Sequence, residues 1–512
     1  MSALLADVAV RAPSVEYGPM LPFLVLAGGM VATIFVSLIG RPAFQRVVTP
    51  LVAVAALLAA GVIFALRIGE PDPSIMSGAL ALDDLALVFD LLFVAAALCT
   101  AVLAWRSSTL REAGRGEFYA LLITAVLGMA LLASSANLIS FFIGFELLSI
   151  PLYVLCAADL RRNASLEAGL KYLIVGSLGS AVLLYGLALI YGATGSTDFI
   201  RIGRALAAPA IGDDPLLLVG VGLTLAGLAF KASVAPFHQW TPDVYEGAPT
   251  PVAAFMAVAT KFAVLAVLLR FGGLALAPVR DHWAIVLAAL ATVTIVVGNL
   301  GALRQESLKR MLGYSAVAQI GYLLAGVAVG TWLGVYAIVF YLFAYLVMNI
   351  GPFAVVIARE RAGAGDGLRG LRDLGREAPL LAWPMTICMI ALAGLPVTAG
   401  FFGKLLLVQA AIDGHYAWLG VVIVLGSAIS LGYYLRVVVA IWMPSSAEGL
   451  LEGAGVQPAM AGADPEADAR RHPELVTLAV LAAAAAIFFG FYPQPLLDLA
   501  REAANAFTLL SR

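Results

Sequence analysis

The chain is a succession of apolar runs, each long enough to cross a lipid bilayer. A membrane-spanning helix needs about 20 consecutive, mostly apolar residues, and such runs recur along almost all of the 512 residues. Hydrophobic residues make up 62% of the chain and charged residues 12%, whereas soluble domains contain about 25% charged residues. The composition therefore predicts a membrane protein and excludes a soluble enzyme or a disordered protein. With a net charge of −2 the chain also lacks the basic surface that nucleic-acid binding requires.

Fourteen segments meet the length expected of a transmembrane helix. They are 19–40, 47–67, 83–105, 117–135, 137–157, 166–192, 215–236, 250–270, 283–303, 308–329, 332–358, 380–411, 416–443 and 474–493. The sequence thus predicts an all-α polytopic membrane protein with about 14 transmembrane helices.

Basic residues are unevenly shared between the two sets of connecting loops. One set carries 17 Arg and Lys residues, and the set that includes both termini carries 8. Because positive charge accumulates on the cytoplasmic side, we expect both termini to lie outside.

Lysine is rare and is concentrated in apolar segments. Only five of the 30 basic residues are lysines, and four of them fall inside predicted helices, as does Glu146. An ionised residue at the centre of a lipid-facing helix costs about 2.5–3.5 kcal/mol. We therefore expect these five residues to face the interior of the bundle, form ion pairs, hold water or lose their charge: Glu146, Lys171, Lys231, Lys261 and Lys404.

The choice of lysine over arginine indicates proton transfer. A buried lysine can lose its proton near neutral pH, whereas arginine keeps its proton in any protein site. The alternative is a structural role, in which the lysines form ion pairs or extend to the interface. That alternative applies most directly to Lys171, which has Glu167 one helical turn earlier. The fifth lysine, Lys309, is expected to be a topology charge at a helix end.

Two predicted helices contain breaks. Pro236 ends the segment 215–236 and is followed by His238, a possible proton relay. Pro396 interrupts the segment 380–411, and Lys404 comes shortly after it. Broken helices at membrane depth are tolerated where they line a protein-filled or water-filled interior.

The breaks fall in helices 7 and 12, which are five apart. Inverted-topology repeats place paired broken helices at the ion path, so we expect two inverted five-helix repeats, helices 4–8 and 9–13. The resulting domain organisation is 1–116 (helices 1–3), 117–270 (first repeat), 283–443 (second repeat), 444–473 (a cytoplasmic loop) and 474–512 (helix 14).

Other chemistry-bearing residues are sparse. Three cysteines lie far apart in apolar runs, and four histidines do not cluster, so neither an iron–sulfur nor a haem or metal site is expected. Asp83 and Asp84 precede the third predicted helix and are interpreted as interface residues. Asp90, about two turns further in, is a weak candidate for a functional site.

Several segments resemble the antiporter-like membrane subunits of respiratory complex I. They include GFELLSIPLYVL (144–155), FKASVAPFHQWTPDVYEGAPTPV (230–252) and LAGLPVTAGFFGK (392–404). The amino-acid sequence of these segments is most similar to that of the N-type subunits, since M-type subunits have Glu where this chain has Lys404. The resemblance covers most of residues 80–440.

The resemblance implies a proton relay driven by redox chemistry elsewhere. In it, Glu146 pairs with Lys231, Lys261 is the central relay, and Lys404 lies nearer the exit. Lys171 would match an additional lysine of N-type subunits, and His238 would lie between Lys231 and Lys261.

The resemblance also implies partners and cofactors outside this chain. NADH, FMN, iron–sulfur clusters and quinone are expected on other subunits, with no cofactor here. The expected partners are other antiporter-like and small subunits of the membrane arm, and the lipid bilayer of a bacterial plasma membrane. Three alternatives stay open: a subunit of a multisubunit cation/proton antiporter, a non-pumping scaffold, and a self-sufficient quinone reductase, which the absence of any cofactor motif disfavours.

Overall fold

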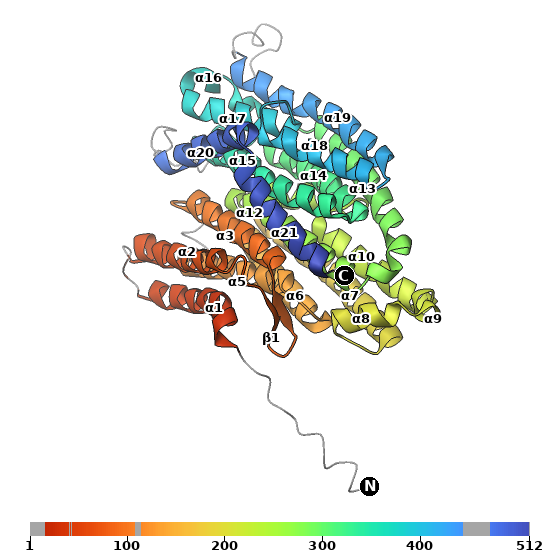
Figure 1. Ribbon diagram of the computed structural model, residues 1–512. Helices are drawn as coiled ribbons and strands as arrows, with labels where there is room; N and C mark the ends of the chain where they lie inside the picture. The colour runs from red at the N-terminus through yellow and green to blue at the C-terminus, as the bar shows by residue number, and fades with distance from the viewer. Residues whose placement is uncertain (1–15, 40, 42–43, 108–113, 444–471, 511–512) are drawn as a thin grey trace.

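A computed structural model describes residues 16–39, 41, 44–107, 114–443 and 472–510 of the chain. These residues form a bundle of roughly aligned helices with one small β-hairpin (Figure 1). The predicted cytoplasmic loop 444–473 lies outside the described residues except for its last two positions.

The first half of the chain supplies the elements up to the eighth predicted span. They are α1 (Tyr17–Ser37), α2 (Thr49–Leu66) with a preceding π-helical turn (Phe44–Val48), β1 (Asp72–Ile75), β2 (Leu80–Leu82), α3 (Asp84–Ala104), α5 (Arg115–Ala133), α6 (Leu138–Cys156), α7 (Asn163–Thr194), α8 (Phe199–Leu206), α9 (Pro209–Gly212), α10 (Pro215–Ala232), α11 (Trp240–Gly247) and α12 (Thr250–Leu274).

The second half continues the bundle. Its elements are a 3₁₀ turn (Ala277–Val279), α13 (Arg280–Leu303), α14 (Leu308–Val329), α15 (Trp332–Arg361), a second 3₁₀ turn (Leu368–Leu371), α16 (Leu374–Glu377), α17 (Pro379–Ala393), α18 (Ala399–Asp413), α19 (Ala417–Trp442), α20 (Pro473–Phe491) and α21 (Gln494–Leu510).

Thirteen helices of the described residues are long and apolar enough to cross a membrane. The remaining predicted span, 380–411, is divided between α17 and α18, each of 15 residues. At 1.5 Å per residue neither half can cross a bilayer alone. The predicted span 215–236 ends earlier than expected, at Ala232, and a separate short helix, α11, begins at Trp240.

Polar residues between the apolar runs determine where several helices begin. Asn137 accepts hydrogen bonds from the backbone amides of Ile139 and Ser140, and so caps α6. Ser307 caps α14, and Thr331 caps α15, by the same kind of contact. Such caps satisfy amide groups that have no partner within the helix, which explains why most predicted boundaries lie within a few residues of the observed ones.

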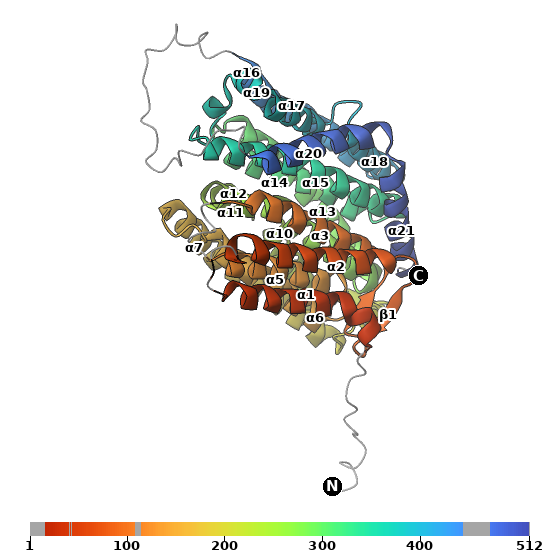
Figure 2. The ribbon, with the colours of Figure 1, turned by 90° about the vertical axis from the view of Figure 1, so that its left-hand side faces the viewer.

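The predicted last span, 474–493, corresponds to α20, and the C-terminal segment also contains a separate helix, α21, that was not predicted. Charged residues on α21, including Asp498 and Arg501, make it too polar to span. Its apolar residues, such as Ala503 and Phe507, are buried, and it packs on α15 and α3. In Figure 2, α21 lies at the same end of the bundle as the β1–β2 hairpin. The all-α prediction did not include this hairpin.

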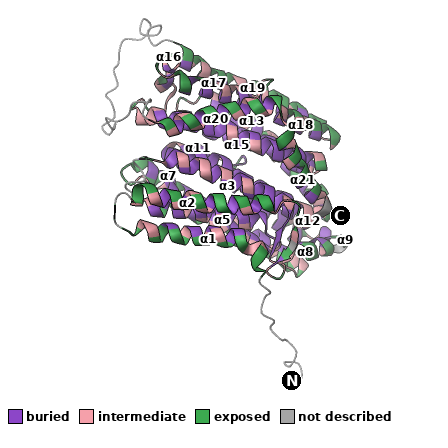
Figure 3. Cartoon of the chain, turned by 60° about the vertical axis from the view of Figure 1, so that its left-hand side comes forward, coloured by how far each residue is buried: buried purple, intermediate pink, exposed green. Residues whose placement is uncertain are grey.

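The core runs through the middle of the bundle, as Figure 3 shows. In the apolar stretch of α12, 100% of the residues are buried, and in that of α14, 94% are buried. Outer helices instead expose large apolar side chains, such as Phe35 on α1 and Leu66 on α2. An exposed apolar surface of this extent fits contact with lipid or with neighbouring subunits.

Neighbouring helices approach closely where glycine removes the side chain. A Cβ atom on Gly128 of α5 would lie 2.3 Å from the backbone N of Leu148 on α6. A Cβ atom on Gly298 of α13 would lie 2.4 Å from the backbone N of Ala318 on α14. Small residues that allow such backbone contact are typical of helix pairs in membranes.

We expect Gly298→Val to destabilise the chain by about 1–3 kcal/mol, since the new methyl groups must displace the backbone of α14. The measurement is thermal unfolding in detergent. Gly222→Val on α10 is the matched control, because a Cβ atom there meets nothing within 4 Å. Equal effects of the two changes would contradict the packing argument.

Candidate functional site

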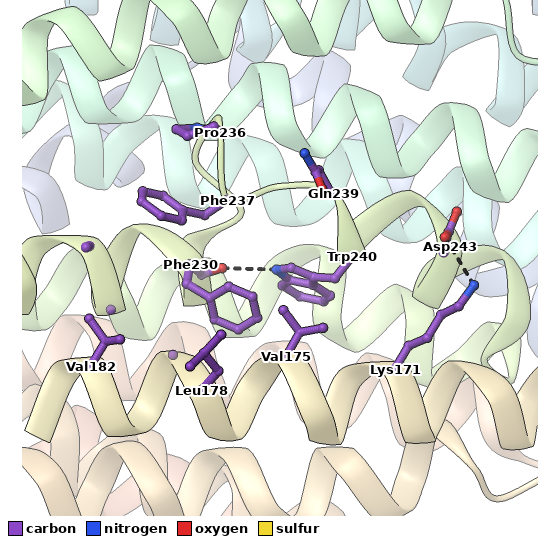
Figure 4. Close-up of a pocket in the computed structure, with 13 residues that line it drawn as sticks. Lys171, Val175, Leu178, Val182, Phe230, Pro236, Phe237, Gln239, Trp240 and Asp243 are labelled. Carbon is purple, nitrogen blue, oxygen red and sulfur yellow. Dashed lines mark hydrogen bonds and ion pairs between the residues drawn. The ribbon is translucent and has the colours of Figure 1, made fainter.

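The first helix break turns the chain between α10 and α11. Ser233 adopts the left-handed conformation at the end of α10, and its hydroxyl accepts a 2.7 Å hydrogen bond from Thr241. The indole Nε1 of Trp240 donates to the carbonyl of Phe230 at 3.1 Å, as Figure 4 shows. The backbone amide of Ala235 donates to Thr294 of α13 at 3.0 Å. The polar groups released by the break are therefore satisfied by protein.

Lys231 lies in the last turn of α10 and is 2% exposed. Its Nζ lies 2.9 Å from the hydroxyls of both Ser149 and Tyr172. It also lies 5.0–5.6 Å from the ring centroids of Phe145, Tyr153 and Tyr172. Aromatic faces attract a cation at this range, and no carboxylate contacts this lysine among the described residues.

The expected ion pair between Glu146 and Lys231 is not formed in the described structure. Ser149, which contacts the lysine, follows Glu146 by three residues on α6, yet the lysine bonds to Ser149 and Tyr172 and forms no ion pair with Glu146 among the described residues. Glu146 Oε1 is buried without a hydrogen-bond partner. The side chain lines a cavity of about 690 Å³ between α6 and α7, together with Ser177 and Ser180.

Lys261 lies in the middle of α12 and is 1% exposed. Its Nζ forms a 2.9 Å hydrogen bond with the hydroxyl of Tyr245 on α11. The broken helix thus supplies the partner of the lysine on the next helix.

Lys404 lies on α18, after the second break, and is 6% exposed. Its Nζ donates to the carbonyls of Leu392 and Ala393, at 2.9 and 3.1 Å, in the last turn of α17. The terminal carbonyls of a helix carry partial negative charge and have no partner within the helix. The ring of Tyr322 lies 5.1 Å away.

A polar network that the sequence analysis missed lies between Lys261 and Lys404. Gln319 of α14 accepts a hydrogen bond from Tyr341 and lies 3.5 Å from the carbonyl of Leu392, which Lys404 also contacts. The hydroxyl of Tyr345 is buried without a partner, one turn beyond Tyr341 on α15. The available signal was spacing, since polar residues recur every three or four positions in these apolar helices: Ser315, Gln319 and Tyr322 on α14, and Tyr341, Tyr345 and Asn349 on α15.

Lys171 does not face the interior and instead forms the ion pair with Glu167 that was the alternative for this residue. Its side chain is 44% exposed, and its Nζ lies 2.7 Å from Glu167 and 3.3 Å from Asp243. Figure 4 shows Lys171 and Asp243 at one end of a cavity of about 470 Å³, which Pro236 and Phe237 also line.

Neither His238 nor the second proline, Pro396, has a hydrogen bond or ring contact with a buried lysine among the described residues. The His238 ring lies 6.3 Å from that of Tyr314 on α14, and its Nδ1 has no partner. No hydrogen bond joins it to Lys231 or Lys261 in the part of the chain that the structure describes. Pro396 lies between α17 and α18, within the interruption that ends at Thr398.

Lys309 is the residue that sequence reasoning assigned wrongly. It is fully buried at the start of α14, where its Nζ donates to the carbonyl of Ala248 at 3.1 Å. Glu360 lies 3.5 Å away and accepts a 2.6 Å hydrogen bond from Thr250. The loop between α11 and α12 covers this helix end, which no feature of the local sequence indicates.

No group of three or more His, Cys, Asp or Glu residues within the described ranges could hold a metal ion. The three buried lysines contact hydroxyl and carbonyl oxygens. Amines and hydroxyls can take part in proton exchange, and carbonyls accept hydrogen bonds.

The fold and this site define an antiporter-like membrane protein. A family model described as NADH:quinone oxidoreductase/Mrp antiporter, TM, matches residues 135–430. Subunit N of NADH-quinone oxidoreductase from Trichlorobacter lovleyi is 42% identical over 376 residues, 73% of this chain and 77% of the relative. Subunit N 2 from Roseiflexus castenholzii is 39% identical over 501 residues, 96% of this chain and 97% of the relative. The chain belongs to the subunit N family of NADH-quinone oxidoreductase.

Solved structures agree with this assignment. A chain of respiratory complex I from Thermus thermophilus matches with a TM-score of 0.75 and 35% identity, covering 94% of this chain and 99% of that one. A chain of the Mrp complex from Dietzia matches with a TM-score of 0.78 and 23% identity, covering 97% and 100%. The latter similarity shows the fold alone.

We expect Glu360→Gln to destabilise the chain by about 1–3 kcal/mol, because it leaves the buried ammonium of Lys309 without a charged partner. Thermal unfolding in detergent measures the effect. The control is Glu167→Gln, which removes an exposed partner of Lys171 and should cost less than about 1 kcal/mol. A larger effect at Glu167 would show that the Lys309 pair contributes little.

Proposed function

We propose that this chain is a proton-translocating subunit of the membrane arm of an NADH:quinone oxidoreductase in a bacterial plasma membrane. The observation that carries the proposal is the set of partners around three buried lysines. Lys231, Lys261 and Lys404 are held by hydroxyl or carbonyl oxygens and not by carboxylates. A hydroxyl can accept from an ammonium and donate to a neutral amine, so each contact with a hydroxyl tolerates both protonation states.

The order of the groups supports a path across the middle of the bundle. Lys231 and Lys261 lie on adjacent helices, α10 and α12, which pack together. Beyond Lys261, the tyrosines of α15 and Gln319 lead to the carbonyl of Leu392, which Lys404 contacts. In this proposal Lys404 is the last lysine before the proton path leaves the protein. His238 and Lys171 lie beside the path, near the point where protons enter it.

Glu146 acts on Lys231 through space in this proposal. Its carboxylate lies less than one helical turn from Ser149 on α6 and faces a cavity. An opposite charge nearby favours the charged form of a lysine. A movement of α6 that changes the separation would therefore change the proton affinity of Lys231.

The free energy comes from outside this chain. Moving one charge across 100 mV costs about 2.3 kcal/mol, and the neutral contacts of the lysines supply no such energy. NADH, FMN, iron–sulfur clusters and quinone therefore belong to other subunits in this proposal. The neighbours are other membrane-arm subunits, and both termini lie outside.

We also propose that residues 117–270 and 283–443 are inverted repeats. Supporting this, α5 packs on α6 as α13 packs on α14, with a glycine contact in each pair. In both units the fourth helix is interrupted: α10 and α11 in the first, α17 and α18 in the second. A left-handed residue ends the first part of each, Ser233 and Gly394.

We expect Lys261→Met to lower NADH-driven proton pumping at least tenfold in membrane vesicles, since it removes the only titratable amine of α12. Native electrophoresis should show normal assembly, because methionine fits the space of the lysine chain. Lys261→Arg should also lower pumping, since arginine does not release its proton. Normal pumping by an assembled Lys261→Met complex would indicate a scaffold and not a pump.

We expect Glu146→Gln to lower pumping and coupled quinone reductase activity several-fold, because the amide no longer favours the charged form of Lys231. Both rates are measured in the same vesicles. Asp498→Asn on α21 is the control, since its exposed carboxylate pairs with Arg501 outside the proposed path. Unchanged coupling in Glu146→Gln would remove this residue from the relay.

A subunit of a multisubunit cation/proton antiporter is the second candidate. The description of the family model and the fold of the Dietzia Mrp chain favour it. Sodium-dependent proton transport without NADH-linked activity would support it over the first proposal. A self-sufficient quinone reductase has no supporting observation.

A further inference from the structure

A second group of buried polar side chains lies where α3, α5 and α12 meet. These three helices pack against one another. Arg270 follows Lys261 on α12 by nine residues, about two and a half turns, so the two side chains point to opposite sides of the helix. The group is therefore separate from the lysine series.

An ion pair anchors this group. Asp83 caps α3, and its Oδ1 accepts from the backbone amide of Ala86 at 2.9 Å. The same oxygen lies 2.5 Å from Nη2 of Arg270, a residue with no exposed surface. Nε of Arg270 donates to the carbonyl of Ala133 at the end of α5, at 2.6 Å. The pair thus joins all three helices.

Around the pair, five side-chain atoms are buried without a hydrogen-bond partner. They are Asp83 Oδ2, both carboxyl oxygens of Asp90, Ser134 Oγ and Arg270 Nη1. Asp90, Ser134 and Arg270 have exposed fractions of 0%. Asp90 lies two turns beyond Asp83 on the same face of α3, within electrostatic range of both Asp83 and Arg270. Buried polar atoms without a protein partner typically bind internal water, and each such water makes about three hydrogen bonds.

The charges of the group are unequal. Asp83 and Arg270 balance each other, which leaves the carboxyl group of Asp90 without a counter-ion in the described structure. An isolated ionised carboxylate is strongly disfavoured in such surroundings and takes up a proton instead. The nearby guanidinium group disfavours a metal cation as the alternative.

We propose that Asp90 is a buried proton-binding group that exchanges its proton with the aqueous phase through water held by Asp83, Ser134 and Arg270. In the exchange, a water-borne proton adds to a carboxylate oxygen of Asp90 and leaves by the same route. The route opens at the end of the bundle where the β1–β2 hairpin lies. There, the backbone amide of Ala81 donates to the carbonyl of Ser134 at 2.7 Å. This inference stands on its own geometry and does not need the lysine relay.

The proposal is tested by infrared difference spectroscopy of the intact membrane complex, in which the spectrum in H₂O is compared with the spectrum in D₂O. The wild-type complex should show a protonated-carboxyl C=O band that shifts after transfer to D₂O. Asp90→Asn should abolish this band, and Asp90→Glu should retain it at a displaced frequency. Asp84→Asn, which changes the neighbouring carboxylate that accepts from the amide of Gly69, should leave the band unchanged.

Three results would overturn the proposal. The first is an identical spectrum in wild type and Asp90→Asn, which would mean that Asp90 carries no proton. The second is a band that D₂O does not shift, which would mean that no water reaches the site. The third is loss of the band on adding sodium, which would indicate a cation site. If Asp90→Asn fails to assemble, the displaced band of Asp90→Glu decides between these outcomes. A failure of the lysine relay would appear in the Lys261 variants without changing these spectra.

Discussion

A charged side chain inside a bilayer needs partners supplied by the protein, and the structure depends on this constraint. The lipid phase contains no water that could solvate Lys231, Lys261 or Lys404. Each Nζ therefore forms its hydrogen bonds with groups on neighbouring helices. Those neighbours must lie at fixed positions to reach the lysine. The packing of the central helices and the location of the site therefore have one common cause.

The helix breaks supply several of these partners. An unbroken helix satisfies its own carbonyls, whereas the end of α17 leaves those of Leu392 and Ala393 free for Lys404. The break after α10 lets α11 place Tyr245 against Lys261. Breaking a helix in a membrane would be costly without such contacts, so each break and its lysine stabilise each other.

Buried charge takes two forms in this chain. Lys309 and Arg270 each have a carboxylate in contact, Glu360 and Asp83 respectively, and each ion pair joins two helices. The three central lysines have only neutral oxygens in contact, and Asp90 has no partner among the described residues. The paired groups fit structural roles. The three lysines fit proton exchange, because a lysine that loses its proton becomes neutral and leaves no contacting carboxylate without a counter-ion.

The sequence by itself determined the membrane class, most helix boundaries and the interior position of three lysines, because apolar length and the cost of burying charge are local properties. It could not determine which side chains meet. The separation of Glu146 from Lys231, the exposure of Lys171, the burial of Lys309 and the network around Gln319 all depend on helix rotation and on loops that cover helix ends. Helix α21 was missed because an amphipathic helix lacks the long apolar run by which spans are found. Contacts between distant helices are decided by tertiary packing, in which a rotation of one residue, about 100°, exchanges an interior position for a lipid-facing one.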